Sequence, residues 1–204
     1  MTITAEKDDD GDSQIVIKAT NAVTSNTDAA TTTDGTTAAD TSETGIWAKV
    51  DSKVGDLGSY IASDKHIETI IEIDASTLTA DTIDLESVNE LKMGTQGVGI
   101  GVAVNVSNAS SRVLVKDSNL TSTKNGIKLL AKSVIESKAD AQAKAGNVAV
   151  GVSVISGSTE ASITGSGTIN SKKGLLVSAE SNAQATTNAI GKAANDNRSG
   201  AFAG

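Results

Sequence analysis

The chain has 204 residues, enough for one domain and too few to require two. A net charge of −8 argues against nucleic acid or an anionic membrane as partner, and the absence of cysteine excludes disulfides, a thiolate nucleophile and cysteine-based zinc sites. Aromatic residues make up 1% of the chain and proline is absent, which predicts a thin core of small or branched aliphatic side chains in uninterrupted strands.

Two apolar blocks lie near the start of the chain. Ile15, Ile17 and Ala19 are apolar residues at every second position, which is the period-two pattern of a strand that buries one face. Ile3 and Ala5 repeat this alternation over a shorter stretch, and we interpret them as a further copy of the same block. The sequence therefore predicts strands on both sides of the intervening polar segment.

That polar segment is an acidic turn with the sequence Asp8-Asp9-Asp10-Gly11-Asp12. Its alternate carboxylates, Asp8, Asp10 and Asp12, are candidate ligands for calcium, because they can converge on one hard cation. The turn differs from an EF-hand loop, because its glycine stands at another position and it has no glutamate that could bind calcium through both oxygens. A solvated turn between two strands is the interpretation that we favour, and no other cofactor is predicted.

Residues 21–64 are the least repetitive part of the chain and are expected to be an irregular or inserted segment. The threonine-rich stretch 31–37 could present a regular hydroxyl array, of the kind that binds ice or glycans, but its low complexity favours a loop. Trp47 and Tyr60 are expected to cover a loop against the rest of the fold. Because insertions in solenoids often form the binding face, we place any ligand contacts in residues 21–64.

His66 is the only histidine. No motif places a serine or carboxylate beside it as a catalytic partner, so we expect an exposed residue at a strand edge rather than a general base.

A repeat of 48–50 residues dominates the rest of the chain and is clearest in residues 97–145 and 146–193. Three apolar blocks recur in the same order, at offsets of 50, 49 and 48 residues. The matched positions are Ile100, Val102 and Val104 with Val150, Val152 and Val154; Leu120 with Ile169; and Ile127, Leu129 and Ala131 with Leu175, Val177 and Ala179.

Earlier copies of two blocks are also visible. Ile83, Leu85 and Ser87 match the third block, as do Ile15, Ile17 and Ala19. The second block, with the end of the strand before it, recurs at Ile71, Ile73 and Leu78, which match Val113, Val115 and Leu120. The N-terminal part is therefore expected to share the architecture of the repeats.

Each block alternates large and small side chains, which predicts strands rather than helices. In residues 98–106, valine and isoleucine alternate with glycine, alanine and asparagine, and this longest apolar run is far shorter than the roughly 20 residues of a membrane helix. Gly97, Gly99 and Gly101 lack the spacing of a dinucleotide-binding loop, so we expect a small-residue face that another layer approaches closely. Residues 133–145 could also propagate a helix, but their alternating counterpart favours a strand.

A repeat of this length holds enough strands and turns for about two coils of a solenoid. One copy alone buries too few aliphatic side chains to offset the entropy of ordering it, so neighbouring coils must stack. The sequence therefore predicts an all-β chain, residues 1–204 forming a single β-solenoid. Because the sequence is repetitive at both ends, we expect it to be part of a longer chain with flanking repeats.

The order of three features resembles large repetitive bacterial exoproteins: the glycine-valine run 97–105, the Gly-Ile/Leu-x-Leu/Val-x-Ala block at 126–131 and 174–179, and the alternating alanines that follow. These exoproteins include the fusobacterial leukotoxin-type filamentous adhesins and, more distantly, haemagglutinin-like passengers of type V secretion. The resemblance covers residues 71–204 and departs in residues 21–64. It implies a right-handed parallel β-helix that is secreted or displayed at the bacterial outer surface, with no catalytic residues to carry over.

The function expected from these observations is a non-catalytic structural or adhesive segment, without membrane insertion, whose partners are a host-cell surface or matrix component or a glycan. One alternative is a β-helical polysaccharide lyase or glycoside hydrolase, and another is a segment of a secreted cytotoxin. The enzyme would need clustered carboxylates or basic residues in a groove. The residues available for this are the acidic pairs Glu68/Glu72 and Asp81/Asp84 and the arginines Arg112 and Arg198.

Overall fold

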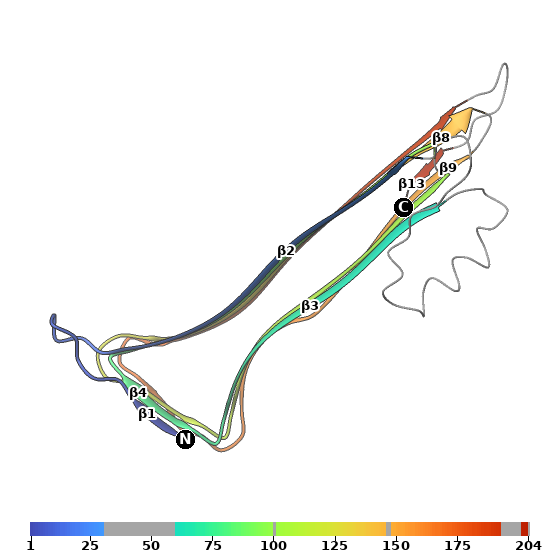
Figure 1. Ribbon diagram of the computed structural model, residues 1–204. Coiled ribbons are helices and arrows are strands. Elements are labelled where there is room, and N and C mark those ends of the chain that lie inside the picture. The colour runs from blue at the N-terminus through green and yellow to red at the C-terminus, as the bar shows by residue number, and fades with distance from the viewer. Residues whose placement is uncertain (31–59, 100, 146–147, 193–200, 204) are drawn as a thin grey trace.

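The computed structural model describes residues 1–30, 60–99, 101–145, 148–192 and 201–203, and within these ranges every regular element is a β-strand. All strand pairs in these ranges are parallel, and the strands form three sheets (Figure 1). The prediction of an all-β chain with parallel strands is confirmed.

The three sheets differ in length. The short sheet contains, in order, β1 (Thr2–Thr4), β4 (Thr77–Ala80), β7 (Asn119–Ser122) and β11 (Ile169–Ser171). The β5 sheet contains β2 (Gln14–Ala30), β5 (Thr82–Val98), β8 (Ile127–Ala145) and β12 (Leu175–Lys192). In the β6 sheet, β6 (Val102–Lys116) pairs with β3 (Tyr60–Asp74), β9 (Ala149–Ser156) and β10 (Thr159–Thr164), and β13 (Ala201–Ala203) pairs with β9. The two long sheets run side by side along an arm, and the short sheet joins them at one end (Figure 1).

The chain passes through the three sheets in a fixed order. It runs from β3 to β4 to β5, then from β6 to β7 to β8, and then from β9 and β10 to β11 to β12. One repeat therefore makes one passage through the sheets, whereas the sequence suggested about two. The reason is strand length: β6 has 15 residues and β8 has 19, so a single passage uses the whole repeat.

The strand registers confirm most of the repeat alignment. The third block forms the column Ile15, Ile83, Ile127 and Leu175, and the second block forms the column Leu78, Leu120 and Ile169. Ile3 joins this second column beside Leu78, so its assignment to the third block was wrong. The first block was also misaligned by two residues, since Val150 lies beside Val102 rather than Ile100. A slide of two leaves every side chain on the same face, so alternation alone cannot detect it.

The interior is apolar where the short sheet meets the long sheets. Aliphatic side chains from all three sheets pack there in columns, and Leu78, Leu85, Leu120 and Leu129 are each 0% exposed. These leucines occupy positions at which the copies of the repeat in this chain each have an aliphatic residue. Stacking of the strands therefore places an aliphatic residue of one layer on the equivalent aliphatic residue of the next, and the two bury each other.

The arm buries small and polar side chains together with a second aliphatic cluster that contains Leu91, Met93 and Ile135. Ala103, Ala139 and Ala141 pack between the two long sheets, and a Cβ added at Gly151 would lie 2.9 Å from the carbonyl oxygen of Asn188 on the facing sheet. Buried serines cross the gap: Ser87 Oγ donates to the Thr69 carbonyl oxygen at 3.0 Å. Around Gly151 and these alanines, the gap between the two sheets has no room for a large ring.

The corner between the β6 sheet and the short sheet uses left-handed backbone. Ala75, Asp117 and Gly165 follow the last paired residues of their strands and have φ values of 45°, 46° and 86°. Asp117 Oδ1 also accepts a hydrogen bond from Ser166 N at 2.9 Å, which ties one layer to the next. Glycine and aspartate suit this conformation, whereas alanine at position 75 is strained.

Candidate binding surfaces

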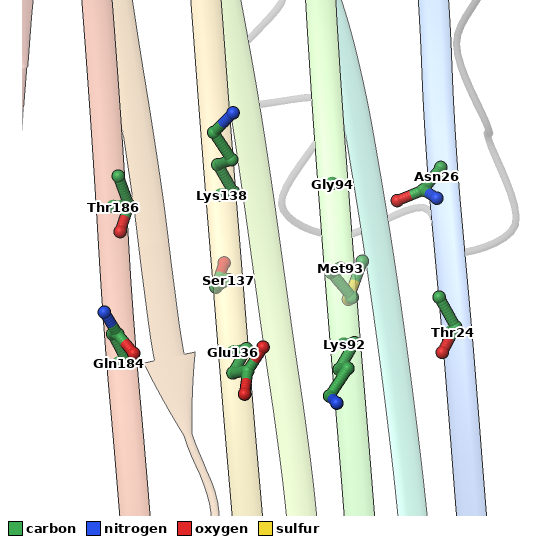
Figure 2. Close-up of a pocket in the computed structure, with 10 residues that line it drawn as sticks. All are labelled: Thr24, Asn26, Lys92, Met93, Gly94, Glu136, Ser137, Lys138, Gln184 and Thr186. Atoms are coloured by element: carbon green, nitrogen blue, oxygen red, sulfur yellow. The ribbon is translucent and has the colours of Figure 1, made fainter.

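A hollow of about 350 Å³ lies on the β5 sheet and crosses all four of its strands (Figure 2). Two rows of residues in register line it: Thr24, Lys92, Glu136 and Gln184, and next to them Asn26, Gly94, Lys138 and Thr186. The alternation of the strands turns these side chains away from the buried residues Met93 and Ser137. The hollow therefore presents polar groups from strands that the sequence separates by more than 40 residues.

Gly94 is what makes room at the centre of this surface. A Cβ at this position would lie 2.6 Å from Asn26 Oδ1, on the neighbouring strand. The space beside Gly94 thus depends on a missing side chain, and the Asn26 amide borders it.

The charges around the hollow are balanced. Lys92 Nζ lies 2.8 Å from Glu90 Oε1, and Lys138 Nζ lies 2.7 Å from Asp140 Oδ2. The hydrogen bond from Lys92 to Glu90, with the field of Glu136, raises the pKa of Lys92 above its ordinary value. Paired charges with amide and hydroxyl groups suit hydrogen bonding to a polar uncharged ligand better than attraction of an ion.

The same face carries a ladder of ion pairs nearer the short sheet. Glu86 Oε2 lies 3.1 Å from Lys18 Nζ and 3.7 Å from Lys128 Nζ, and Lys128 Nζ also lies 3.7 Å from Asp84 Oδ1. The hydrogen bond from Lys18, followed by the charge of Lys128, lowers the pKa of Glu86. Each ion pair joins two neighbouring layers, so this part of the surface is held by its own partners.

In the acidic turn, two of the three candidate calcium ligands already have partners within the protein. Asp8 Oδ1 accepts hydrogen bonds from Asp10 N at 3.1 Å and from Asp12 N at 2.9 Å, and Asp12 pairs with Lys124. The pairing with Asp12 raises the pKa of Lys124. Among the described residues, no three acidic or histidine side chains converge in a way that could hold a metal ion.

Calcium binding by Asp8, Asp10 and Asp12 therefore stays a candidate from the sequence, beside the solvated turn that we favour. Because Asp8 and Asp12 already have partners, we expect a chelator to leave the melting temperature of the purified chain unchanged. A melting temperature that falls on chelation and recovers with added calcium would contradict the partners seen here.

Of the other residues singled out in the sequence, the structure brings Glu68 and Arg112 into contact. His66 is exposed on β3. Glu68 pairs with Arg112 at 2.6 Å, and Asp84 pairs with Lys128, so these carboxylates are engaged separately. Asp81 is buried at a corner and bonded to Ser13. The structure thus brings none of these acids together as a facing pair.

The irregular segment is narrower than the sequence suggested. Residues 21–30 belong to β2 and residues 60–64 to β3, in register with the neighbouring strands. The threonine-rich stretch 31–37 and Trp47 lie outside the described residues. The hollow around Gly94 was missed, because its residues share no local motif. A glycine within an alternating strand was the only signal available.

Comparisons with protein-family models, with curated proteins and with solved structures gave no match for this chain. Within the described ranges, no helix is long and apolar enough to cross a membrane.

Proposed function

We propose that this chain is a segment of a right-handed parallel β-solenoid with a structural and adhesive role in an exported bacterial surface protein. Three parallel sheets that the chain visits in a fixed order support the solenoid, since each repeat then adds one layer to a stack. The general preference of parallel crossover connections supports the right hand. The resemblance to leukotoxin-type filamentous adhesins supports export, surface display and a non-catalytic role.

The contact surface in this proposal is the hollow around Gly94. The observation that carries it is the pair of in-register polar rows on four strands, held rigidly by the sheet below. Rigid strands present side chains with little loss of entropy on binding. A polar uncharged glycan, on a host cell or in its matrix, fits the balanced charges.

The direct test is binding of the purified chain to an array of neutral and acidic glycans and to matrix proteins. Gly94→Thr fills the hollow with a residue that strands favour, and we expect it to reduce binding at least tenfold. Ser162→Thr on β10, in the other long sheet, is the matched control and should bind as the unmodified chain does.

Three results would overturn the proposal. The first is the absence of any glycan or matrix ligand. The second is binding that Gly94→Thr leaves unchanged while circular dichroism shows both proteins folded. The third is release of reducing or unsaturated sugar ends from pectin, alginate or related polymers, which would make the chain a polysaccharide-cleaving enzyme.

A further inference from the structure

The outward face of the short sheet carries a regular array of threonine and asparagine side chains. β1, β4 and β7 begin with the pattern polar-apolar-polar, and Thr168, which directly precedes β11, completes the same pattern there; the apolar residue, such as Leu78 or Leu120, points into the core. The outward positions are Thr2 and Thr4 on β1, Thr77 and Thr79 on β4, Asn119 and Thr121 on β7, and Thr168 and Asn170 at β11. We call these eight residues the threonine face.

The strand register aligns the threonine face in two columns. Thr4, Thr79, Thr121 and Asn170 lie side by side on successive strands, and Thr2, Thr77 and Asn119 form the parallel column. Side chains on one face recur about every 6.6 Å along a strand and about every 4.8 Å between strands. The hydroxyl and amide groups therefore repeat in two directions with a spacing fixed by the backbone.

The chemistry of this face is uniform. All eight positions are uncharged, and all are exposed or half-buried. The branched Cβ of threonine restricts its χ1 rotamers, so hydroxyl and methyl groups are held in place before any ligand arrives. The outward surface of the β5 sheet differs, because ion pairs such as that between Lys18 and Glu86 cross it.

These properties select the kind of partner. An ionic ligand would find no opposite charge among these eight residues, and a sugar would find no aromatic ring among them to stack on. A solid lattice whose neutral hydrogen-bonding groups repeat in two directions can form hydrogen bonds with both columns of the threonine face at the same time. The oxygen atoms on a prism face of ice repeat at distances close to both spacings of the array.

We propose that the threonine face binds ice. Each hydroxyl exchanges a hydrogen bond with liquid water for one with the lattice, and the gain per bond is small. Seven of the eight positions are held in register by the strand pairing and act together, so their contributions combine as in multivalent binding. This activity is independent of the glycan site around Gly94, which lies on a different sheet.

The test measures thermal hysteresis and the partition of the purified chain into slowly growing ice. The double variant Thr79→Lys and Thr121→Lys places two bulky charges at the centre of the array and should lower both quantities at least tenfold. Thr20→Lys, an exposed threonine on β2, is the matched control and should leave both unchanged. Circular dichroism establishes that each variant is folded.

Exclusion of the unmodified chain from ice would overturn the proposal. So would ice activity that survives the double variant when it is folded, or an equal loss in Thr20→Lys. If the double variant does not fold, Thr121→Ser replaces it, since loss of one methyl group should reduce hysteresis and leave the fold intact. Gly94→Thr should retain ice activity, which separates this result from the outcome for the glycan site.

Discussion

At the scale of single residues, Asp81 shows how one side chain joins three layers. Its Oδ2 accepts a hydrogen bond from Ser13 N at 3.0 Å in the layer before, and its Oδ1 accepts one from the Thr123 hydroxyl in the layer after. Its carbonyl oxygen accepts a further bond from Asn125 N at 2.8 Å. The bond from Thr123, followed by that from Ser13, lowers the pKa of Asp81 below 3.8.

Asp81 should therefore make stability depend on pH in the acid range. Its folded pKa lies below the unfolded value, so its contribution is present above pH 3.8 and is lost as the pH falls through the folded pKa. Asp81→Asn should lower the melting temperature at neutral pH and should show a smaller further decrease towards pH 2 than the unmodified chain. Asp9→Asn in the exposed turn is the control. Equal pH dependence in the Asp81 variant and the unmodified chain would contradict the role given to this carboxylate.

Ala75 offers a gain in stability, because it holds a left-handed conformation with φ of 45° and is exposed. Left-handed backbone costs a residue with a Cβ roughly 1–2 kcal/mol, and glycine avoids this cost. Ala75→Gly should raise the free energy of unfolding by up to about 1 kcal/mol, which corresponds to about 2–4 °C in Tm for a chain of this size.

The control for Ala75→Gly is Ala131→Gly, a buried alanine in the extended strand β8. Glycine there should destabilise the fold, since the chain loses both packing and backbone restriction. If thermal unfolding showed the same direction of change for both variants, the corner conformation would not be the cause.

At the scale of elements, the close approach of the two long sheets limits what the arm can contain. A Cβ at Gly151 would lie 2.9 Å from one backbone carbonyl oxygen and 3.2 Å from another on the facing sheet, and neither can move alone. Gly151→Ala should therefore destabilise the chain by about 1–3 kcal/mol. Gly94→Ala meets only the flexible side chain of Asn26 and should change stability far less. Chemical denaturation of both variants tests this contrast, which equal losses would contradict.

The strands themselves were predictable where alternation was strong and uncertain where it was weak. Residues 133–145 have a composition that could also propagate a helix, yet β8 continues through them because β5 and β12 pair with it on both sides. Small inward residues such as Ser137 and Ala139 give little apolar contrast, so the strand length could not be predicted. That missing length is why one repeat was taken to fill about two layers.

At the scale of the whole molecule, repetition in the sequence predicted the order of stacking well. The columns that contain Leu78 and Ile83 follow from matching apolar residues, since each layer must place like on like. The surfaces could not be predicted in this way. The hollow around Gly94 and the threonine face both join residues from four strands, and only the register brings those residues together.

The central claim is that one repeat forms one layer, and a disulfide across two layers tests it most directly. Lys132 lies beside Glu180 on the neighbouring strand, at a separation of about 4.8 Å that allows a disulfide. Because the chain has no cysteine, mild oxidation of Lys132→Cys with Glu180→Cys reports on this pair alone. The account predicts nearly complete disulfide formation in the monomer, and little when Ser181→Cys replaces Glu180→Cys, because residue 181 lies on the opposite face of β12. If a layer separated the two strands, they would lie about 9.6 Å apart and both thiols would stay free, which would contradict the account.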